Sequence, residues 1–193
     1  MQTYKLEEFQ PIETERLILR CFTLQDAPMV QRLAGEWEIA AKTLGVPHPY
    51  EDGMAEQWIT THKVAFAEGK IVTLAVTLKP SKILIGSISL GIERGHNVGE
   101  LGYWIGKPYW NKGYCTEAAR ALVDFGFEKV GLNRIQARHL VTNPASGRVM
   151  QKLGMQCEGV LRQVVLARGH YKDLALCAIL REEYNKNSML PDR

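Results

Sequence analysis

The chain has 193 residues, of which 46% are hydrophobic and 23% charged, and its formal net charge is +3. This composition is typical of one globular domain, and the absence of a dense Lys/Arg block argues against direct nucleic-acid binding. No apolar run approaches the ~20 residues of a membrane helix, and Met1 to Gln10 lacks the apolar core of a secretion signal. We expect a cytoplasmic protein that does not contact a membrane.

The cysteines and histidines show no spacing that is typical of a metal or redox centre. Cys21, Cys115, Cys157 and Cys177 are far apart in the sequence and form no C-x-x-C pair. The five histidines form no H-E-x-x-H or comparable motif. We expect reduced, mostly structural thiols and no metal ion.

The first part of the chain predicts one strand followed by helices. Alternating apolar side chains indicate a strand over 14–22, after which Thr23 and Asp26 form a Thr-x-x-Asp capping pattern. Two prolines exclude a helix from the segment Leu44 to Tyr50. The predicted helices of this part are a first one after Thr23 that ends before Gly35, a short one at 36–43 and a longer one at 51–68.

From Ile71 onward the apolar period becomes that of a sheet. The predicted strands are 71–78, 82–93, 98–105, 134–141, 155–168 and 170–180, and the predicted helices are 113–130 and 143–153. The fold class is therefore α+β: a mixed, mostly antiparallel twisted sheet of about seven strands, flanked by helices, with a central β-α-β unit. We expect a single domain over residues 1–193, with a core at about 12–184 and a loose tail at 185–193.

The junction at Gly113 has the features of an anion-binding site. A short polar loop runs there directly into a strong helix pattern. The first turn of a helix presents backbone N–H groups without an intrahelical partner, and the helix dipole adds positive charge. Glycine lets a ligand approach the backbone closely. An ordinary loop before a core helix remains the alternative from this junction alone.

Five sequence words in one order resemble the GCN5-related N-acetyltransferases (GNAT), and within them the ribosomal-protein N-terminal acetyltransferases. The resemblance covers about residues 12–184. The words are Glu100-Leu-Gly-Tyr-Trp-Ile105, Pro108-Tyr-Trp-Asn-Lys-Gly-Tyr-Cys-Thr-Glu-Ala118, Asn143-Pro-Ala-Ser146, Lys152-Leu-Gly-Met155 and Glu158-Gly-Val-Leu-Arg162. Trp110 and Cys115 depart from the family loop Gln/Arg-x-x-Gly-x-Gly/Ala, but neither change removes a backbone donor.

The resemblance implies acetyl-CoA as co-substrate, with its pyrophosphate on the backbone of the Gly113 loop and its pantetheine arm beside the predicted strand 98–105. The positions that match cofactor-binding positions of the family are Tyr103, Trp104, Ile105, Trp110, Asn111, Lys112, Gly113, Tyr114, Cys115, Thr116, Asn143 and Ser146. Asn143 before Pro144 is also a plain helix cap, and both roles can coexist.

The predicted catalytic residues are Glu100 and Ser146. Amide formation from a thioester needs a neutral amine, and Glu100, in an otherwise apolar strand, is the candidate that takes its proton. Its alternative is a solvent-facing charge on an edge strand. Ser146 is the candidate that protonates the departing thiolate, and a main-chain N–H near Tyr103 to Ile105 could hold the oxyanion. The family transfers the acetyl group directly, so we expect no covalent role for Cys115.

The acceptor is less defined by the sequence. By analogy with the family, Tyr50, Trp58, Glu100 and Tyr171 are assigned to the substrate side. The first hypothesis is an N-acetyltransferase for a primary amine, in particular a protein N-terminus such as that of a ribosomal protein. The alternatives are a small amine (amino acid, polyamine or antibiotic) and a non-catalytic acyl-CoA binding module. A homodimer also stays open.

Overall fold

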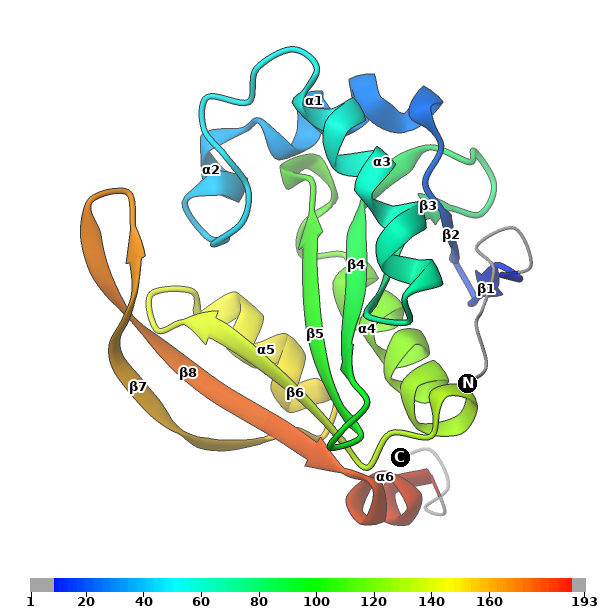
Figure 1. Ribbon diagram of the computed structural model, residues 1–193, viewed down its shortest axis with the longest axis vertical. Coiled ribbons are helices and arrows are strands. Elements are labelled where there is room, and N and C mark those ends of the chain that lie inside the picture. The colour runs from blue at the N-terminus through cyan, green and yellow to red at the C-terminus, as the bar shows by residue number, and fades with distance from the viewer. Residues whose placement is uncertain (1–8, 189–193) are drawn as a thin grey trace.

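The computed structural model describes residues 9–188 and shows an eight-stranded mixed sheet with helices on both faces (Figure 1). The strands follow the spatial order β1-β2-β3-β4-β5-β6-β8-β7. They are β1 (Ile12–Glu13), β2 (Leu17–Cys21), β3 (Ile71–Leu78), β4 (Leu84–Glu93), β5 (Val98–Ile105), β6 (Arg134–Leu140), β7 (Gln156–Ala167) and β8 (His170–Leu180). The α-helices are α1 (Ala27–Ala34), α2 (Trp37–Ala40), α3 (Met54–Ala67), α4 (Tyr114–Phe125), α5 (Pro144–Lys152) and α6 (Arg181–Ser188). The predicted α+β class with a mostly antiparallel sheet is confirmed.

The strand count is eight instead of the predicted seven, because the two-residue strand β1 precedes the first predicted strand, 14–22. Thr14 separates β1 from β2: its backbone N–H donates to the Leu17 carbonyl at 3.0 Å, and the Leu17 N–H donates to Thr14 Oγ1 at 3.0 Å. A side chain that bonds to nearby backbone in this way competes with the strand ladder. The chain therefore turns between β1 and β2.

The predicted β-α-β unit is present as β5, α4 and β6. β4 and β5 pair in antiparallel fashion over the full length of β5, to Ile105. The parallel pairing of β5 with β6 is shorter, since it covers Val98 to Leu101 against Arg134 to Ala137. Beyond Leu101 the two strands diverge, as Figure 1 shows. The sheet is thus open at its centre, between β5 and β6.

Two helical layers cover the sheet. α4 and α5 pack on one face, and α1 and α3 pack on the other, over β3 and β4. Each face has its own apolar cluster, one around Leu122 and Ile135 and one around Val30 and Ile59. A fully buried leucine or isoleucine contributes about 1.5–3 kcal/mol relative to an exposed one.

The predicted boundaries hold within a few residues in most elements. Thr23 and Asp26 form a reciprocal capping box at the start of a 3-10 helix that leads into α1. α3 begins at Met54, three residues later than predicted, and α4 ends at Phe125, where a π-helix (Gly126–Val130) continues the chain. Close packing explains Gly126, since a Cβ there would lie 2.7 Å from Ile135 Cδ1.

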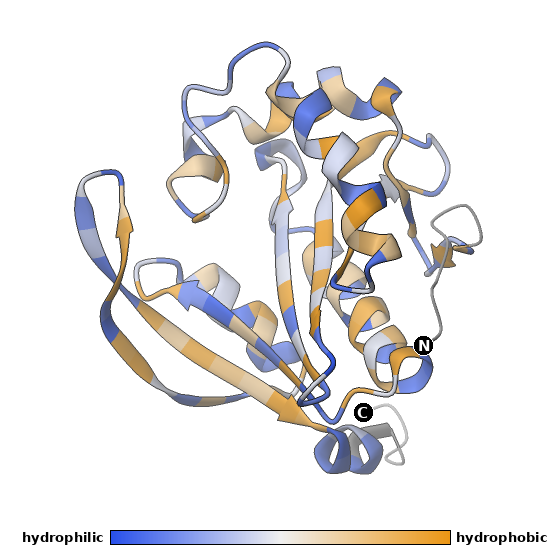
Figure 2. Cartoon of the chain, in the orientation of Figure 1, coloured by the Kyte–Doolittle hydropathy of each residue, from blue (hydrophilic) through white to orange (hydrophobic). Residues whose placement is uncertain are grey.

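The C-terminal part forms a long hairpin of β7 and β8 and then a helix. α6 (Arg181–Ser188) includes residues 185–188 of the segment that was predicted to be a loose tail, and the rest of that segment, residues 189–193, lies outside the described part. Figure 2 shows α6 as almost entirely hydrophilic. The four cysteines form no disulfide within residues 9–188, although the hairpin register places Cys157 opposite Cys177. None of the helices in residues 9–188 is long and apolar enough to cross a membrane.

Candidate active site

The loop before α4 has the backbone geometry of an anion site. Asn111 and Gly113 both have left-handed backbone angles, with φ of 59° and 80°. The first intrahelical bond runs from the Glu117 N–H to the Gly113 carbonyl at 3.1 Å, so the N–H groups of residues 114–116 precede the helical ladder. Together with the helix dipole, these donors favour a phosphate at this position.

The loop adjoins a cleft of about 500 Å³, a volume within the usual range of ligand sites. The cleft lies where the end of β5 meets the starts of α4 and α5, and we call this the cofactor side. The predicted residues that line it are Tyr103, Trp104, Ile105, Trp110, Asn111, Gly113, Tyr114, Cys115, Thr116, Asn143 and Ser146. The structure therefore brings together eleven of the twelve predicted cofactor residues, from three separate stretches of the chain.

Lys112 is the predicted cofactor residue that does not line the cleft. Its carbonyl accepts a hydrogen bond from Arg16 Nη1 at 3.0 Å, and its ammonium lies 5.8 Å from the centre of the Tyr109 ring. Because its neighbours Asn111 and Gly113 both line the cleft, Lys112 is the residue at which the loop turns outward.

Tyr103 and Ser146 meet within the cleft. The Tyr103 hydroxyl and Ser146 Oγ are 2.9 Å apart, and the Tyr103 hydroxyl also donates to the Ser146 carbonyl at 3.2 Å. Burial raises the pKa of Tyr103 well above its ordinary value, so its phenol keeps its proton at neutral pH. The sequence analysis had given Tyr103 a main-chain role only. Its hydroxyl, paired with Ser146, is a second proton donor at the same point.

Asn143 caps the N-terminus of α5 and also contacts the segment after α2. Its Oδ1 accepts from the Ser146 N–H at 3.4 Å, which is the helix cap, and its Nδ2 donates to the Lys42 carbonyl at 3.4 Å. Asn143 thereby joins the start of α5 to the segment after α2.

Cys115 lines the cleft but is not an activated thiol. Burial raises the pKa of Cys115 to about 12, which outweighs any acidifying effect of its place in the first turn of α4. The thiolate is scarce at neutral pH, which agrees with direct transfer of the acetyl group.

Three basic residues of the cleft were missed from the sequence: Lys42, Arg148 and Lys152. Lys42 lies with its ammonium 4.2 Å from the centre of the Trp110 ring. Arg148 and Lys152 are four residues apart on α5, so helical spacing alone would have placed them on one face of this helix.

Glu100 lies on the opposite side of β5 from Tyr103, because side chains alternate along a strand. β5 lies between β4 and β6, so Glu100 is not on an edge strand. Its Oε1 accepts from Arg138 Nη2 at 2.6 Å and from Arg138 Nε at 2.9 Å, and its side chain is 40% exposed. Glu100 also precedes the point where β5 and β6 diverge. A substrate that contacts both Glu100 and Ser146 therefore has to occupy the opening between the two strands.

The other predicted substrate residues do not line the cleft. Trp58 belongs to the apolar cluster of α1 and α3, where its ring centre lies 5.1 Å from that of Phe22 and 4.4 Å from that of His62. Tyr50 packs against the same cluster. Tyr171 is 65% exposed on β8. Their assignment to the substrate remains a prediction.

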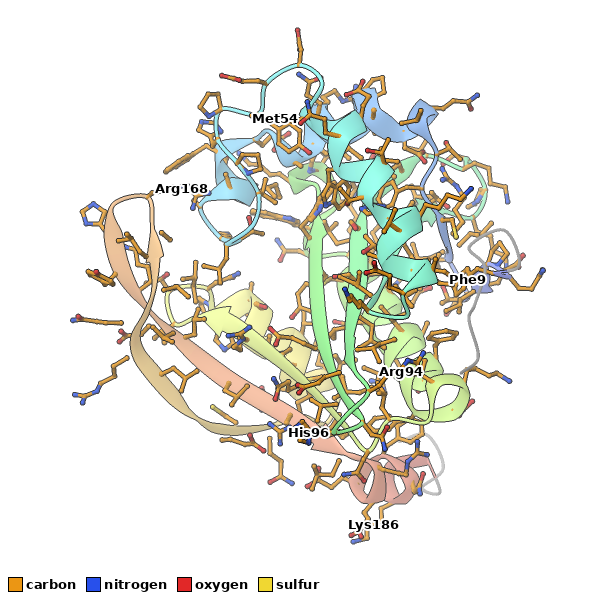
Figure 3. The ribbon with its side chains drawn as sticks, in the orientation of Figure 1. Phe9, Met54, Arg94, His96, Arg168 and Lys186 are labelled. Atoms are coloured by element: carbon orange, nitrogen blue, oxygen red, sulfur yellow. The ribbon has the colours of Figure 1, made fainter. Side chains whose placement is uncertain are left out.

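The contact between the β7–β8 hairpin and the α2 region was not predicted from the sequence. Arg168, at the tip of the β7–β8 hairpin, donates to the Val46 carbonyl at 3.1 Å and lies 5.6 Å from the centre of the Trp37 ring (Figure 3). The hairpin tip is thus joined to α2 and the loop after it. We predict that the amine acceptor binds against α2, this loop, the hairpin tip and the Glu100–Arg138 pair, and we therefore call this surface the acceptor side.

Comparison with known proteins agrees with this geometry. Residues 16–156 match the family model described as the acetyltransferase (GNAT) domain. The chain is 30% identical over 177 residues to p20 of Bacillus licheniformis, described as an uncharacterized N-acetyltransferase, and the match covers 91% of this chain and 98% of p20. It is 28% identical over 155 residues to YdaF of Bacillus subtilis, assigned provisionally as a ribosomal N-acetyltransferase, and that match covers 80% of this chain and 81% of YdaF.

A solved structure from Vibrio cholerae has the same fold. That protein is assigned provisionally as a ribosomal-protein-serine acetyltransferase. The superposition has a TM-score of 0.77 at 25% identity and covers 89% of this chain and 97% of the other.

Proposed function

This chain belongs to the GNAT acetyltransferase family, and from that premise we propose that it acetylates the α-amine of a protein N-terminus, such as that of a ribosomal protein. Acetyl-CoA is the acetyl donor. The observation that supports binding of acetyl-CoA is the cleft. In it, the Gly113 loop and the first turn of α4 meet the end of β5, which β6 leaves unpaired.

The residues of the cleft fit coenzyme A in chemistry and position. The backbone N–H groups of residues 113–116 suit a pyrophosphate. Lys42, Arg148 and Lys152 add positive charge around them. The end of β5 beyond Leu101 presents main-chain groups to an extended chain such as the pantetheine arm. Bound there, acetyl-CoA supplies an activated thioester.

The side chains on the two faces of β5 have complementary tasks in this proposal. Glu100 takes the proton of the acceptor amine, directly or through a water, and Arg138 holds its carboxylate in place. Ser146 and Tyr103 hold a proton where the sulfur of coenzyme A leaves. A main-chain N–H from the end of β5 binds the carbonyl oxygen of the acetyl group.

The α-amine is favoured as acceptor for two reasons. An α-amine has a pKa of about 8 and a lysine about 10.4, so a site without strong deprotonating help favours an N-terminus at neutral pH. The resemblance to YdaF and to the Vibrio cholerae protein supports a ribosomal target.

Intact-mass analysis tests this function. Purified ribosomal proteins are incubated with acetyl-CoA and the enzyme, and release of the free thiol is followed with a panel of amino acids and polyamines in parallel. We expect a gain of one acetyl group on a ribosomal protein with a free N-terminus, and none on a preparation whose α-amines were blocked beforehand. Rapid turnover of a free amine with no mass gain would instead establish the small-amine alternative, and binding of coenzyme A without turnover would establish the non-catalytic one.

A further inference from the structure

A charged cluster joins the start of the chain to the cofactor loop. Glu117, in the first turn of α4, accepts from the Thr14 hydroxyl at 2.6 Å and from the Arg16 N–H at 2.8 Å through Oε1. Its Oε2 accepts from Arg16 Nε at 2.7 Å and Nη2 at 2.6 Å. Partial burial pushes the pKa of Glu117 upward, but the hydrogen bonds from Thr14 and Arg16 outweigh it and lower the pKa. The carboxylate is thus charged and fully engaged.

The same guanidinium reaches the loop itself. Arg16 Nη1 donates to the Lys112 carbonyl at 3.0 Å, and its Cζ lies 4.8 Å from the centre of the Tyr114 ring. A Cβ on Gly113 would lie 3.2 Å from Arg16 Nη2. Arg16 therefore contacts three consecutive residues, two of which line the cleft.

These contacts have a stereochemical consequence for the anion site. In a trans peptide unit the C=O and the next N–H point in opposite directions. Because Arg16 binds the Lys112 carbonyl, the Gly113 N–H of the same peptide unit points away from Arg16.

We propose that Arg16, held by Glu117, is a positioning residue that fixes the Gly113 loop so that its backbone donors face the pyrophosphate. The inference rests on the proposed use of this cleft for coenzyme A. Glu117 holds the Arg16 side chain in place and does not itself line the cleft.

A direct electrostatic role for Arg16 makes the opposite prediction for Glu117. If the guanidinium attracted a phosphate by its charge alone, removal of the neighbouring carboxylate would free that charge and tighten binding. If Arg16 acts through the loop, the same removal releases Arg16 from its place and weakens binding. The Glu117→Gln variant therefore separates the two roles by the sign of its effect.

The chain contains a matched control in Arg20 and Asp26. Arg20 Nη1 and Nη2 donate to Asp26 Oδ2 and Oδ1, both at 2.7 Å, so this pair is also bidentate. It is more buried than the Arg16 pair, with 29% and 9% of the two side chains exposed against 44% and 15%. Neither residue lines the cleft. Arg20→Met should lower thermal stability without changing coenzyme A affinity.

The experiment measures coenzyme A binding by calorimetry, the KM for acetyl-CoA, kcat and the melting temperature for wild type, Arg16→Met, Arg16→Lys, Glu117→Gln, Thr14→Val and Arg20→Met. Loss of a charged hydrogen bond weakens an interaction about tenfold, so we expect the Kd for coenzyme A and the KM for acetyl-CoA to rise by about that factor in Arg16→Met and Glu117→Gln. The kcat at saturating acetyl-CoA should be unchanged. Arg16→Lys should not restore binding, because an ammonium cannot bridge Glu117 and the Lys112 carbonyl as a fork does.

Each outcome either supports or overturns the positioning role of Arg16. Tighter or unchanged binding in Glu117→Gln overturns the positioning role while the proposed function stands. Equal loss of affinity in Arg20→Met attributes the effect to general stability and overturns it as well. If Glu117→Gln does not fold, Thr14→Val, which removes one donor to the same carboxylate, has to weaken binding in its place. Failure of the wild type to bind coenzyme A would refute the proposed function and this inference together.

Discussion

The cofactor side takes most of its lining from three short stretches of sequence, whereas the acceptor side is assembled from α2, β5, β6 and the tip of the β7–β8 hairpin. On the first side the important groups are backbone donors, which a loop of few residues can present by itself. On the second they are side chains such as Glu100, Arg138 and Arg168, which meet across distances of 38 to 122 residues in the chain. The comparison predicts that cofactor binding and acceptor turnover can be changed separately.

The largest effect should come from Glu100→Gln. Removing a general base lowers kcat by about 10²- to 10³-fold, while the KM for acetyl-CoA should stay the same because Glu100 lies outside the cofactor cleft. Steady-state kinetics with both substrates varied measures the two separately. Glu158→Gln is the control, since Glu158 is also paired with an arginine, Arg134, at 2.6 Å. Full turnover in Glu100→Gln would show that the acceptor side does not supply the base.

Gly113→Ala tests the cofactor side by itself. A side chain at φ of 80° is strained and would meet Arg16 at 3.2 Å, so coenzyme A affinity should fall about tenfold or more. Calorimetric titration with coenzyme A measures it. Gly159→Ala is the matched control, because a Cβ there has nothing within 4 Å and its φ is not left-handed. Unchanged affinity in Gly113→Ala would mean that coenzyme A binding does not depend on the left-handed backbone conformation of residue 113.

The pH dependence of stability tests the packing of the α1–α3 layer, to which His62 of α3 belongs. His62 is 7% exposed, and among residues 9–188 neither of its ring nitrogens has a hydrogen-bond partner. Burial lowers the pKa of His62 from 6.5 to about 4. The fold therefore favours the neutral ring, so the stability that this ring confers is complete above pH 6.5 and is lost as the pH falls toward 4.

We expect His62 to reduce the free energy of unfolding by about 1–2 kcal/mol at pH 5 relative to pH 7.5. Denaturant unfolding at a series of pH values, for wild type and His62→Phe, measures this difference. The variant should lose the part of the pH dependence between 6.5 and 4. An identical dependence in both proteins would contradict the effect.

Arg168→Ala should have the smallest effect. Exposed contacts such as those of Arg168 with the Val46 carbonyl and the Trp37 ring contribute little binding energy. The KM for the amine acceptor should therefore rise only about two- to fivefold, with the KM for acetyl-CoA unchanged. Arg162→Ala is the control, because Arg162 is an exposed arginine on β7, outside the hairpin tip. A shift in the KM for acetyl-CoA alone would place the hairpin tip on the cofactor side and remove the distinction.

Much of the fold could be read from local patterns. The period-2 run at 98–105 and the strand at 134–140 were predicted to within a residue, because alternation of buried and exposed side chains is a local property. The short strand β1 was missed, since two residues are too few to show an alternating pattern. The end of α4 at Phe125 was missed because the apolar residues of the sequence continue through Phe127 and Val130, into the π-helix.

The sequence by itself determined the α+β class, the Gly113 loop at the start of α4 and most of the residues that line the cleft, because backbone donors at a helix start are specified by adjacent residues. Only the tertiary structure decided that β5 and β6 part after Leu101, that Tyr103 meets Ser146, and that Arg138 pairs with Glu100. It also showed that Arg16 holds a loop 96 residues away. Contacts of this kind depend on the register and crossing of elements distant in sequence, which no local pattern encodes.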